Sequence, residues 1–280
     1  MRIWTWTLAH GRSIKLGASA VIMGVLNVTP DSFSDGGRYA EAVAATTHAD
    51  FMRDEGAVIV DVGGESTRPG AERVESGAEQ ARVLPIVQAL SRAGHLISID
   101  SYRASTAGLA VAAGAHIVND VSGLSADPRL PDIVAESGAG LVIMHTGRGR
   151  QKLPDVIDDQ LHFLGNAVEI AFRAGIKKEQ IVLDPGFGFA KETADENIEL
   201  MSRFEELAVL GYPMLVGTSR KRFVGSITNR EPADRDAGTA ATSVILRLKG
   251  ASIFRVHNVA PNRDALLVAD AMLVAEASQE

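Results

Sequence analysis

The sequence predicts an α/β fold in which eight parallel strands, alternating with helices, close into a single TIM barrel. Three observations carry the prediction: eight short apolar runs rich in β-branched residues, a helical pattern after each run, and the regular spacing of these units. Apolar runs without polar alternation are typical of strands buried on both faces. Alternating strands and helices form right-handed βαβ units, and eight of them in about 250 residues match a (β/α)8 barrel.

Each expected strand is followed by an expected helix. The strands are expected at 21–28, 58–64, 96–100, 117–121, 141–146, 181–186, 213–219 and 253–259. The helices are expected at 41–55, 75–93, 103–113, 128–137, 158–174, 196–209, 236–249 and 261–276. Glycines directly after these helices, such as Gly138 and Gly175, favour ends there because glycine readily adopts the left-handed backbone that closes a helix.

The residues before the first unit predict a small addition to the barrel. In the segment 1–18, two short apolar runs flank a His-Gly-Arg turn, which predicts a β-hairpin at the bottom of the barrel. No linker or low-complexity stretch interrupts the chain, so residues 1–280 are expected to form one domain. An open, doubly wound sheet is the alternative, and the count of eight evenly spaced units favours the barrel.

The composition argues against several functional classes. The formal net charge is −7 and no long basic stretch occurs, which argues against nucleic acid as a partner. The absence of cysteine excludes disulfides, thiolate zinc sites and a cysteine nucleophile, and it agrees with a reducing cytoplasm. The first residues lack the pattern of a signal peptide, and no apolar run approaches the ~20 residues of a membrane helix. We therefore expect a cytoplasmic protein without membrane contacts.

Polar side chains at the ends of the predicted strands mark the expected active site, since barrels of this kind carry their reactive groups there. These residues are Asn27, Asp61, Asp100, Asn119, His145, Asp184, Ser219, Arg255 and His257. Polar residues can simply begin a loop, but Asp61, Asp100 and Asp184 lie in or directly after apolar runs. An unpaired carboxylate would be costly there, so each needs a partner, and a polar ligand is a candidate.

The loops after the strands differ in what they predict. The loops 27–37 and 63–70 are rich in hydrogen-bond donors, glycine and proline, so both are expected to take part in function. The loop 218–225 is strongly basic and, together with the last strand, predicts a phosphate site. The basic loop 147–152 has no such placement, and we expect it to be a solvated face without function.

Most cofactor motifs are missing from the sequence. The run GFGFAK at 186–191 resembles a dinucleotide fingerprint but lacks its third glycine, and no GxxxxGK[ST] or HExxH pattern occurs. The seven histidines show no metal-ligand spacing, which argues against a zinc site. A Mg²⁺ ion held mostly through a substrate diphosphate stays open, because Mg²⁺ needs few protein ligands.

Seven motifs, in this order, resemble those of the dihydropteroate synthase family across roughly residues 21–264. They are MGVLNVTPDSFSDGG, DVGGESTRPGA, SIDSY, IVNDVSG, LDPGFGFAK, GTSRKRFVG and RVHNV. The resemblance implies an enzyme of folate biosynthesis that condenses 6-hydroxymethyl-7,8-dihydropterin diphosphate with p-aminobenzoate, releasing diphosphate and dihydropteroate. It also implies a Mg²⁺ cofactor, a homodimer and inhibition by sulfonamides.

The resemblance also implies a deep pterin pocket in the barrel. Its residues would be Asp100, Asn119, Met144, Asp184, Phe189, Gly217, Lys221 and Arg255. A carboxylate such as Asp184 can accept from two adjacent pterin N–H groups at once, and Asn119 can both donate and accept. Lys221 would donate to the pterin carbonyl, and Arg255 would lie flat over the ring.

A second group of residues is implied at the diphosphate end of the site. Thr67, Arg68 and His257 would bind the diphosphate. Asn27 would be a ligand of the Mg²⁺ ion, which neutralises charge on the leaving group. These residues come from the first, second and last strand ends, which the barrel would bring together.

A third group is implied around the arylamine and the reacting carbon. Asp35 would stabilise the cationic methylene that remains when diphosphate departs. The ring of p-aminobenzoate would lie against Phe33 and Pro69, and its carboxylate would bind at Lys221 or at the backbone after Ser219. The expected catalytic residues are then Asp35, Lys221, Arg255 and His257.

Two features depart from the family pattern, and two alternatives stay open. The family more often has aspartate where this chain has Asn258, which leaves the tuning of His257 in question, and the loop MHTGRGRQ differs from the commoner MHMxGxP. A corrinoid-type pterin methyltransferase is one alternative, against which NVTPDSFSDGG and SRKRF argue. A non-catalytic pterin-binding paralogue is the other, but Asn27, Lys221 and Arg255 are intact.

Overall fold

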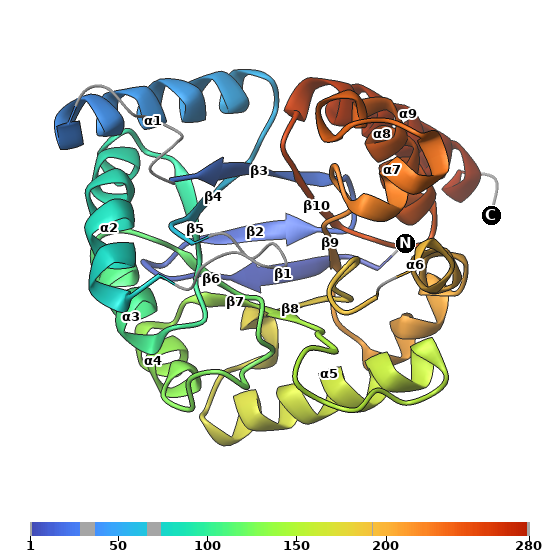
Figure 1. Ribbon diagram of the computed structural model, residues 1–280, viewed down its shortest axis with the longest axis horizontal. Coiled ribbons are helices and arrows are strands. Elements are labelled where there is room, and N and C mark those ends of the chain that lie inside the picture. The colour runs from blue at the N-terminus through green and yellow to red at the C-terminus, as the bar shows by residue number, and fades with distance from the viewer. Residues whose placement is uncertain (1, 29–36, 66–73, 192, 279–280) are drawn as a thin grey trace.

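The computed structural model describes residues 2–28, 37–65, 74–191 and 193–278, and within them eight parallel strands form a nearly closed barrel (Figure 1). The strands are β3 (Val21–Asn27), β4 (Ile59–Gly63), β5 (Leu96–Asp100), β6 (Ile117–Asp120), β7 (Gly140–Met144), β8 (Ile181–Asp184), β9 (Leu215–Val216) and β10 (Ile253–Val256). Their order is β8-β7-β6-β5-β4-β3-β10-β9, and a parallel bridge between Leu183 and Met214 brings its two ends together. The predicted barrel is confirmed, and the open-sheet alternative is excluded because its edge strands would lie apart.

Helices surround the barrel on the outside (Figure 1). They are α1 (Gly37–Asp54), α2 (Ser76–Arg92), α3 (Ala104–Ala112), α4 (Leu130–Ser137), α5 (Val156–Arg173), α6 (Ala194–Ser202), α7 (Arg222–Thr228), α8 (Asp236–Leu248) and α9 (Val259–Ala277). The helix expected at 196–209 is α-helical only in its first part and continues as the 3-10 segment Phe204–Leu210, a common form of helix end. The short helix α7 was not predicted. Its segment was interpreted as part of a basic loop, although Phe223 and Val224 are buried.

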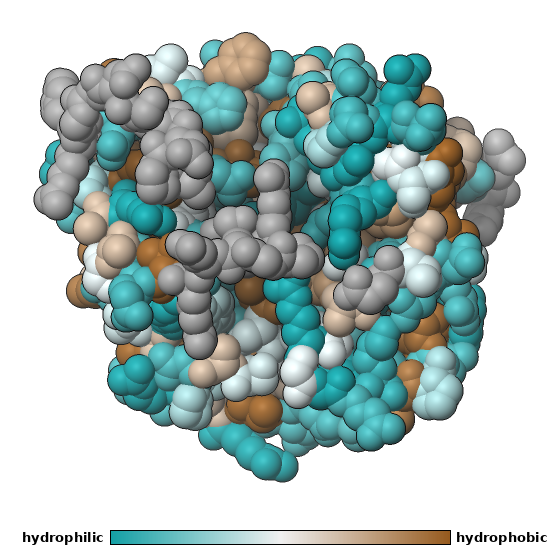
Figure 2. Space-filling model, in the orientation of Figure 1, coloured by the Kyte–Doolittle hydropathy of each residue, from teal (hydrophilic) through white to brown (hydrophobic). Residues whose placement is uncertain are grey.

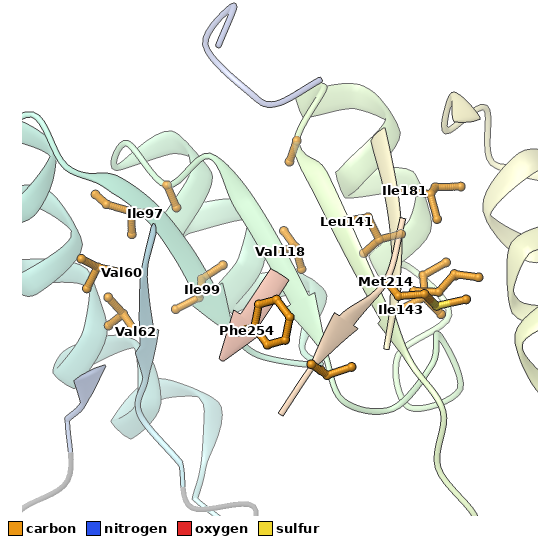
Figure 3. Close-up of a cluster of buried hydrophobic side chains, with 14 of the residues drawn as sticks. Val60, Val62, Ile97, Ile99, Val118, Leu141, Ile143, Ile181, Met214 and Phe254 are labelled. Carbon is orange, nitrogen blue, oxygen red and sulfur yellow. The ribbon is translucent and has the colours of Figure 1, made fainter. Parts of the chain in front are cut away.

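Residues along each strand alternate between two apolar layers, as the pleat of a strand requires. One set lies beneath the helices, and Figure 3 shows part of that layer, including Val60, Val62 and Ile97. The alternate set lies inside the barrel near the strand starts. It comprises Val21, Met23, Ile59, Leu96, Ile117, Val142, Val182, Leu215 and Ile253.

The N-terminal hairpin covers the amino end of the barrel, as predicted. Its strands β1 (Trp4–Thr7) and β2 (Ser13–Leu16) pair antiparallel. Trp6, Leu8 and Leu16 are buried against the inner residues of the strand starts, and the indole Nε1 of Trp6 donates to the carbonyl of Gln180 at 2.7 Å. The lower half of the barrel is therefore filled, and polar groups concentrate at the opposite end.

The polarity of the visible surface agrees with the ordinary proportion of charged and apolar residues in the sequence. The face turned toward the viewer in Figure 2 is mostly hydrophilic, with apolar residues scattered across it. No helix in the described part of the chain is long and apolar enough to cross a membrane.

Candidate active site

A pocket opens at the carboxyl ends of the barrel strands. The space among its lining atoms is about 400 Å³ and is continuous with solvent. It is lined by Asp100, Asn119, Val121, Met144, Asp184, Gly186, Phe187, Phe189, Gly217, Lys221 and Arg255. All eight residues expected in a pterin pocket are among them. The barrel brings them together because β5 through β10 end at one rim, although the residues are up to 155 positions apart in the chain.

Arg255 on β10 is the centre of a buried hydrogen-bond network. Its Nε donates to Oδ2 of Asp61 at 2.6 Å, and its Nη2 donates to Oδ2 of Asp100 at 2.8 Å. Asn119 donates from Nδ2 to the same Oδ2 of Asp61 at 3.2 Å. Burial disfavours the guanidinium charge, but the carboxylates of Asp61 and Asp100 outweigh it and raise the pKa of Arg255. The partners that the buried carboxylate of Asp61 was expected to need are thus two protein side chains, Arg255 and Asn119. Asp61 itself does not line the pocket.

The titratable groups of the pocket have pKa values that burial moves toward neutrality. Burial raises the pKa of Asp100 to about 7, against the opposing charge of Arg255. Burial raises the pKa of Asp184 to about 6, although the Gly186 N–H and the charge of Lys221 oppose it. Burial lowers the pKa of Lys221 to about 8, and Arg255 acts in the same direction. A ligand that donates hydrogen bonds to both acids would hold them ionised.

The loop after β8 is held from behind by a chain of buried polar groups. Gly186 donates its N–H to Oδ1 of Asp184 at 2.7 Å, and its carbonyl accepts from Nζ of Lys191 at 3.0 Å. Nζ of Lys191 also lies 3.2 Å from Nδ1 of His145, whose Nε2 lies 2.9 Å from Asp159. Burial lowers the pKa of His145 to about 3, so the ring is neutral, and Nη2 of Arg150 lies 2.8 Å from the same Nε2. This chain fixes the pocket wall formed by Gly186.

The basic loop 147–152 is only partly the solvated face that we predicted, because Arg148, Gly149 and Gln151 are exposed but Arg150 and Lys152 are partly buried. Arg150 places Nη1 and Nη2 each 2.7 Å from the carboxylate of Asp159. Nζ of Lys152 donates to the carbonyl of Ala190 at 2.7 Å, on the loop that forms the pocket wall. The prediction was wrong for Arg150, because the sequence did not indicate that Asp159 is buried within its reach. The exposed Arg148 lies with its guanidinium carbon 4.7 Å from the ring centre of Phe189.

Two residues expected at the diphosphate end, Asn27 and His257, lie at the ends of the neighbouring strands β3 and β10. Ser219 Oγ is 3.0 Å from Nδ1 of His257 and accepts from the backbone N–H of the same histidine at 3.1 Å. Asn27 ends β3 with its side chain exposed. Other residues expected here or around the arylamine lie outside the described residues. They are Phe33, Asp35, Thr67, Arg68 and Pro69.

Several residues of the site were not predicted from the sequence. Val121, Gly186 and Phe187 line the pocket, and Lys191 supports its wall. The motif LDPGFGFAK contains three of them, and its two glycines alternating with two phenylalanines were the available signal. No signal marked Val121, because an apolar residue after a strand is ordinary.

Asn258 is explained by a partner that the sequence did not reveal. Its Nδ2 donates to Oδ2 of Asp236 at 2.8 Å, and Arg220 donates to both oxygens of Asp236. Hydrogen bonds from Arg220 lower the pKa of Asp236, and the charge of His257 contributes in the same direction. The carboxylate near His257 is therefore supplied by Asp236, and residue 258 has to be a donor.

Replacing Asn258 by aspartate should therefore destabilise the fold. Two carboxylates would face each other, and we expect a loss of about 1 kcal/mol in the free energy of unfolding at pH 7. Repulsion raises the pKa of the new carboxyl in the folded state, so the loss should shrink as acid protonates it. Urea unfolding at pH 7 and pH 4.5 measures both effects. An Asn258→Asp variant as stable as the wild type at pH 7 would show that Asp236 does not need this donor.

Comparisons with known proteins agree with the geometry of the pocket. The model of the pterin-binding enzyme family matches residues 23–257. The dihydropteroate synthase of Bacillus subtilis is 45% identical over 254 residues, which cover 90% of this chain and 88% of that protein.

Two solved structures have the same fold over almost their whole length. Dihydropteroate synthase of Clostridium difficile, in the presence of pteroic acid, superposes with a TM-score of 0.88 at 44% identity and covers 92% of this chain and 98% of its own. The Xanthomonas albilineans enzyme with 4-aminobenzoic acid has a TM-score of 0.89 at 39% identity, with coverage of 96% and 98%. The chain therefore belongs to the pterin-binding enzyme family and, within it, to the dihydropteroate synthases.

Proposed function

We propose that this protein condenses 6-hydroxymethyl-7,8-dihydropterin diphosphate with p-aminobenzoate to form 7,8-dihydropteroate and diphosphate. The observation that carries the proposal is the pocket itself, which combines two buried acids, an amide, a lysine and a partly exposed arginine face at one end of the barrel. A pterin is a flat ring with donors and acceptors on its edge, and this set of groups matches both properties.

The closed part of the pocket suits the pterin ring. Asp184 would accept from the adjacent amino and ring N–H groups, as a carboxylate accepts from the fork of an arginine. Lys221, with its pKa at about 8, is mostly protonated at neutral pH and would donate to the pterin carbonyl. Met144 and Phe189 would form apolar walls, and Gly217 would let the ring approach the backbone. Arg255 would lie against the face of the ring.

The diphosphate would lie at the ends of β3 and β10, and a Mg²⁺ ion fits there only together with it. Asn27 is exposed, and its amide oxygen is the kind of hard oxygen donor that Mg²⁺ prefers. Within the described ranges, no group of three histidine, aspartate or glutamate side chains could hold the ion. Asn27 would thus share the ion with diphosphate oxygens, and the bound ion would neutralise charge on the leaving group. His257 would donate to the diphosphate.

The reaction exchanges one bond for another at the pterin methylene carbon. The carbon–oxygen bond breaks, and its electron pair leaves with diphosphate. The lone pair of the neutral arylamine forms the new carbon–nitrogen bond, and the nitrogen then releases one proton. By resemblance to the family, Asp35 would stabilise the cationic methylene, and Thr67 and Arg68 would bind diphosphate. Phe33 and Pro69 would border the arylamine ring, with its carboxylate near Lys221 or the backbone after Ser219.

Product detection tests the proposed function directly. The purified protein, both substrates and Mg²⁺ should yield dihydropteroate, detected by mass spectrometry, and one equivalent of diphosphate, detected by a phosphate assay coupled to a pyrophosphatase. A sulfonamide should compete with p-aminobenzoate, because it carries the same aryl amine and an anionic group in place of the carboxylate. Methyl transfer from a methylated folate, or pterin binding without product, would contradict the proposal.

The need for Mg²⁺ gives a separate prediction. A chelator should abolish turnover of the diphosphate substrate while leaving the affinity for a diphosphate-free pterin unchanged, since the described residues provide no cage of acids that would hold the ion without diphosphate. Calorimetric titration of the protein with the pterin, with and without chelator, is the control, because it shows whether the chelator affects pterin binding itself. Tight binding of Mg²⁺ to the protein alone, without substrate, would contradict the shared site.

We also propose that the protein forms a homodimer through α8 and α9. These helices expose Ile245, Leu248, Leu267, Val268, Met272 and Val274. Val268 is 72% exposed, and a second copy would remove this apolar surface from water by symmetric contact. The Val268→Glu change should shift the protein from dimer to monomer in sedimentation velocity, whereas a wild-type monomer at micromolar concentration would contradict the interface.

A further inference from the structure

We infer that Asp61 is a positioning residue, which orients Arg255 and Asn119 toward the pterin without touching it. The inference rests on the proposed function and assigns a role to a carboxylate outside the pocket lining. Asp61 has no exposed surface and lies within β4, one residue after Val60 and one before Val62, both of which pack beneath the helices. The side chain of Asp61 therefore points to the opposite side of the strand, into the barrel.

The contact with Arg255 fixes the plane of the guanidinium. A guanidinium held at one nitrogen can still rotate, whereas two contacts at different nitrogens define its plane. Nε of Arg255 meets Asp61 at 2.6 Å, and Nη2 meets Asp100 at 2.8 Å. The arginine is thus held between two carboxylates on β4 and β5, and its side chain remains 22% exposed toward the pocket. A ring that lies against Arg255 therefore meets a surface whose tilt Asp61 helps to set.

The contact with Asn119 decides which atom of the amide faces the ligand. An ionised carboxylate can only accept, so the nitrogen of Asn119 has to turn toward Asp61. Nδ2 of Asn119 lies 3.2 Å from Oδ2 of Asp61, and Asn119 lines the pocket. The amide oxygen then remains for the ligand, which makes Asn119 an acceptor for a pterin N–H. Without the charge of Asp61, the amide could adopt either orientation.

The second oxygen of Asp61 shows that barrel stability alone does not account for this residue. Oδ1 is buried and accepts no hydrogen bond from any described residue. A buried oxygen without a partner is unfavourable, and an apolar side chain of similar size would avoid that cost. The hydrogen bonds that compensate the cost of burying this carboxylate come from two residues of the pocket, Arg255 and Asn119.

The neighbouring strand offers a matched control, Asp120. This carboxylate is also fully buried, but its oxygens accept from Ser122 and from the backbone N–H of Leu124, neither of which lines the pocket. Replacement of either aspartate removes a buried charge with hydrogen bonds. Of the two side chains, however, only that of Asp61 accepts hydrogen bonds from residues that line the pocket.

The test measures binding of a diphosphate-free pterin by calorimetry, with thermal unfolding as a second measurement. Asp61→Asn should weaken binding about 10- to 100-fold, because it removes charged hydrogen bonds that orient two pocket residues. Asp120→Asn should lower the melting temperature but change pterin affinity less than threefold. In an Arg255→Ala background, Asp61→Asn should cost much less affinity than in the wild type, since the two residues act as a unit.

The outcomes separate this inference from the proposed function. If the wild type binds pterin and makes product, yet Asp61→Asn binds pterin as tightly or adds its full effect to Arg255→Ala, the positioning role is overturned. Should Asp61→Asn fail to fold, Arg255→Lys tests the same arrangement, because lysine keeps the charge but cannot reach both carboxylates. Near-wild-type pterin affinity of Arg255→Lys would also overturn it. Failure of the wild type to bind pterin would instead overturn the proposed function.

Discussion

Replacing Asp184 by asparagine should weaken the binding of a diphosphate-free pterin about a hundredfold. One oxygen of Asp184 accepts from the N–H of Gly186 at 2.7 Å, which orients the carboxylate at the end of β8. Asparagine would lose the charge and would turn an amide donor toward either Gly186 or the pterin donors. A lost charged hydrogen bond with such a mismatch costs about 3 kcal/mol. Calorimetry measures the loss directly.

The pH dependence of pterin binding provides the control for this prediction. Because the pKa of Asp184 is raised to about 6, the carboxyl is protonated below that pH and accepts poorly. The affinity of the wild type should therefore fall as the pH drops below about 6, with Asp100 contributing from about pH 7. In the Asp184→Asn variant, the affinity should depend on pH only through the titration of Asp100. Near-wild-type affinity of the variant, or an affinity that rises toward low pH, would show that Asp184 does not bind the pterin as a carboxylate.

Replacing Gly186 by alanine should destabilise the protein severely and remove the pocket wall. Gly186 has a φ of +63°, and an added Cβ would lie 2.1 Å from the backbone carbonyl oxygen of His145. Backbone cannot move aside as a side chain can, so the loop after β8 has to shift. We expect a loss of about 3 kcal/mol or more in the free energy of unfolding, together with loss of measurable pterin binding.

Gly138 provides a matched control for that substitution. It has a similar φ of +65° at the end of α4, but nothing lies within 4 Å of an added Cβ. Gly138→Ala should therefore cost only about 1 kcal/mol, the penalty of a left-handed backbone alone. Urea unfolding of both variants separates conformational strain from the clash. Equal losses for the two variants would show that the contact with His145 does not constrain the loop.

The sequence by itself determined the barrel, its hairpin and most of the pocket. Strand and helix signals are local, since they depend on the apolar period and on the glycines that end helices. Parallel strands of a barrel end at one rim, so polar residues at their ends were predictable as neighbours. Asp100, Asn119, Asp184 and Arg255 could be placed around one pocket for that reason.

Only the tertiary structure decided what each polar side chain does there. Asp61 and Asp100 both interrupt apolar runs, yet one is buried beneath the pocket and the other lines it. The difference arises from the register of neighbouring strands and from Arg255, a partner 194 residues from Asp61. Arg150, which reaches the buried Asp159, shows the same limit. Such pairs depend on how separate segments are placed in space, and local patterns contain no information about that placement.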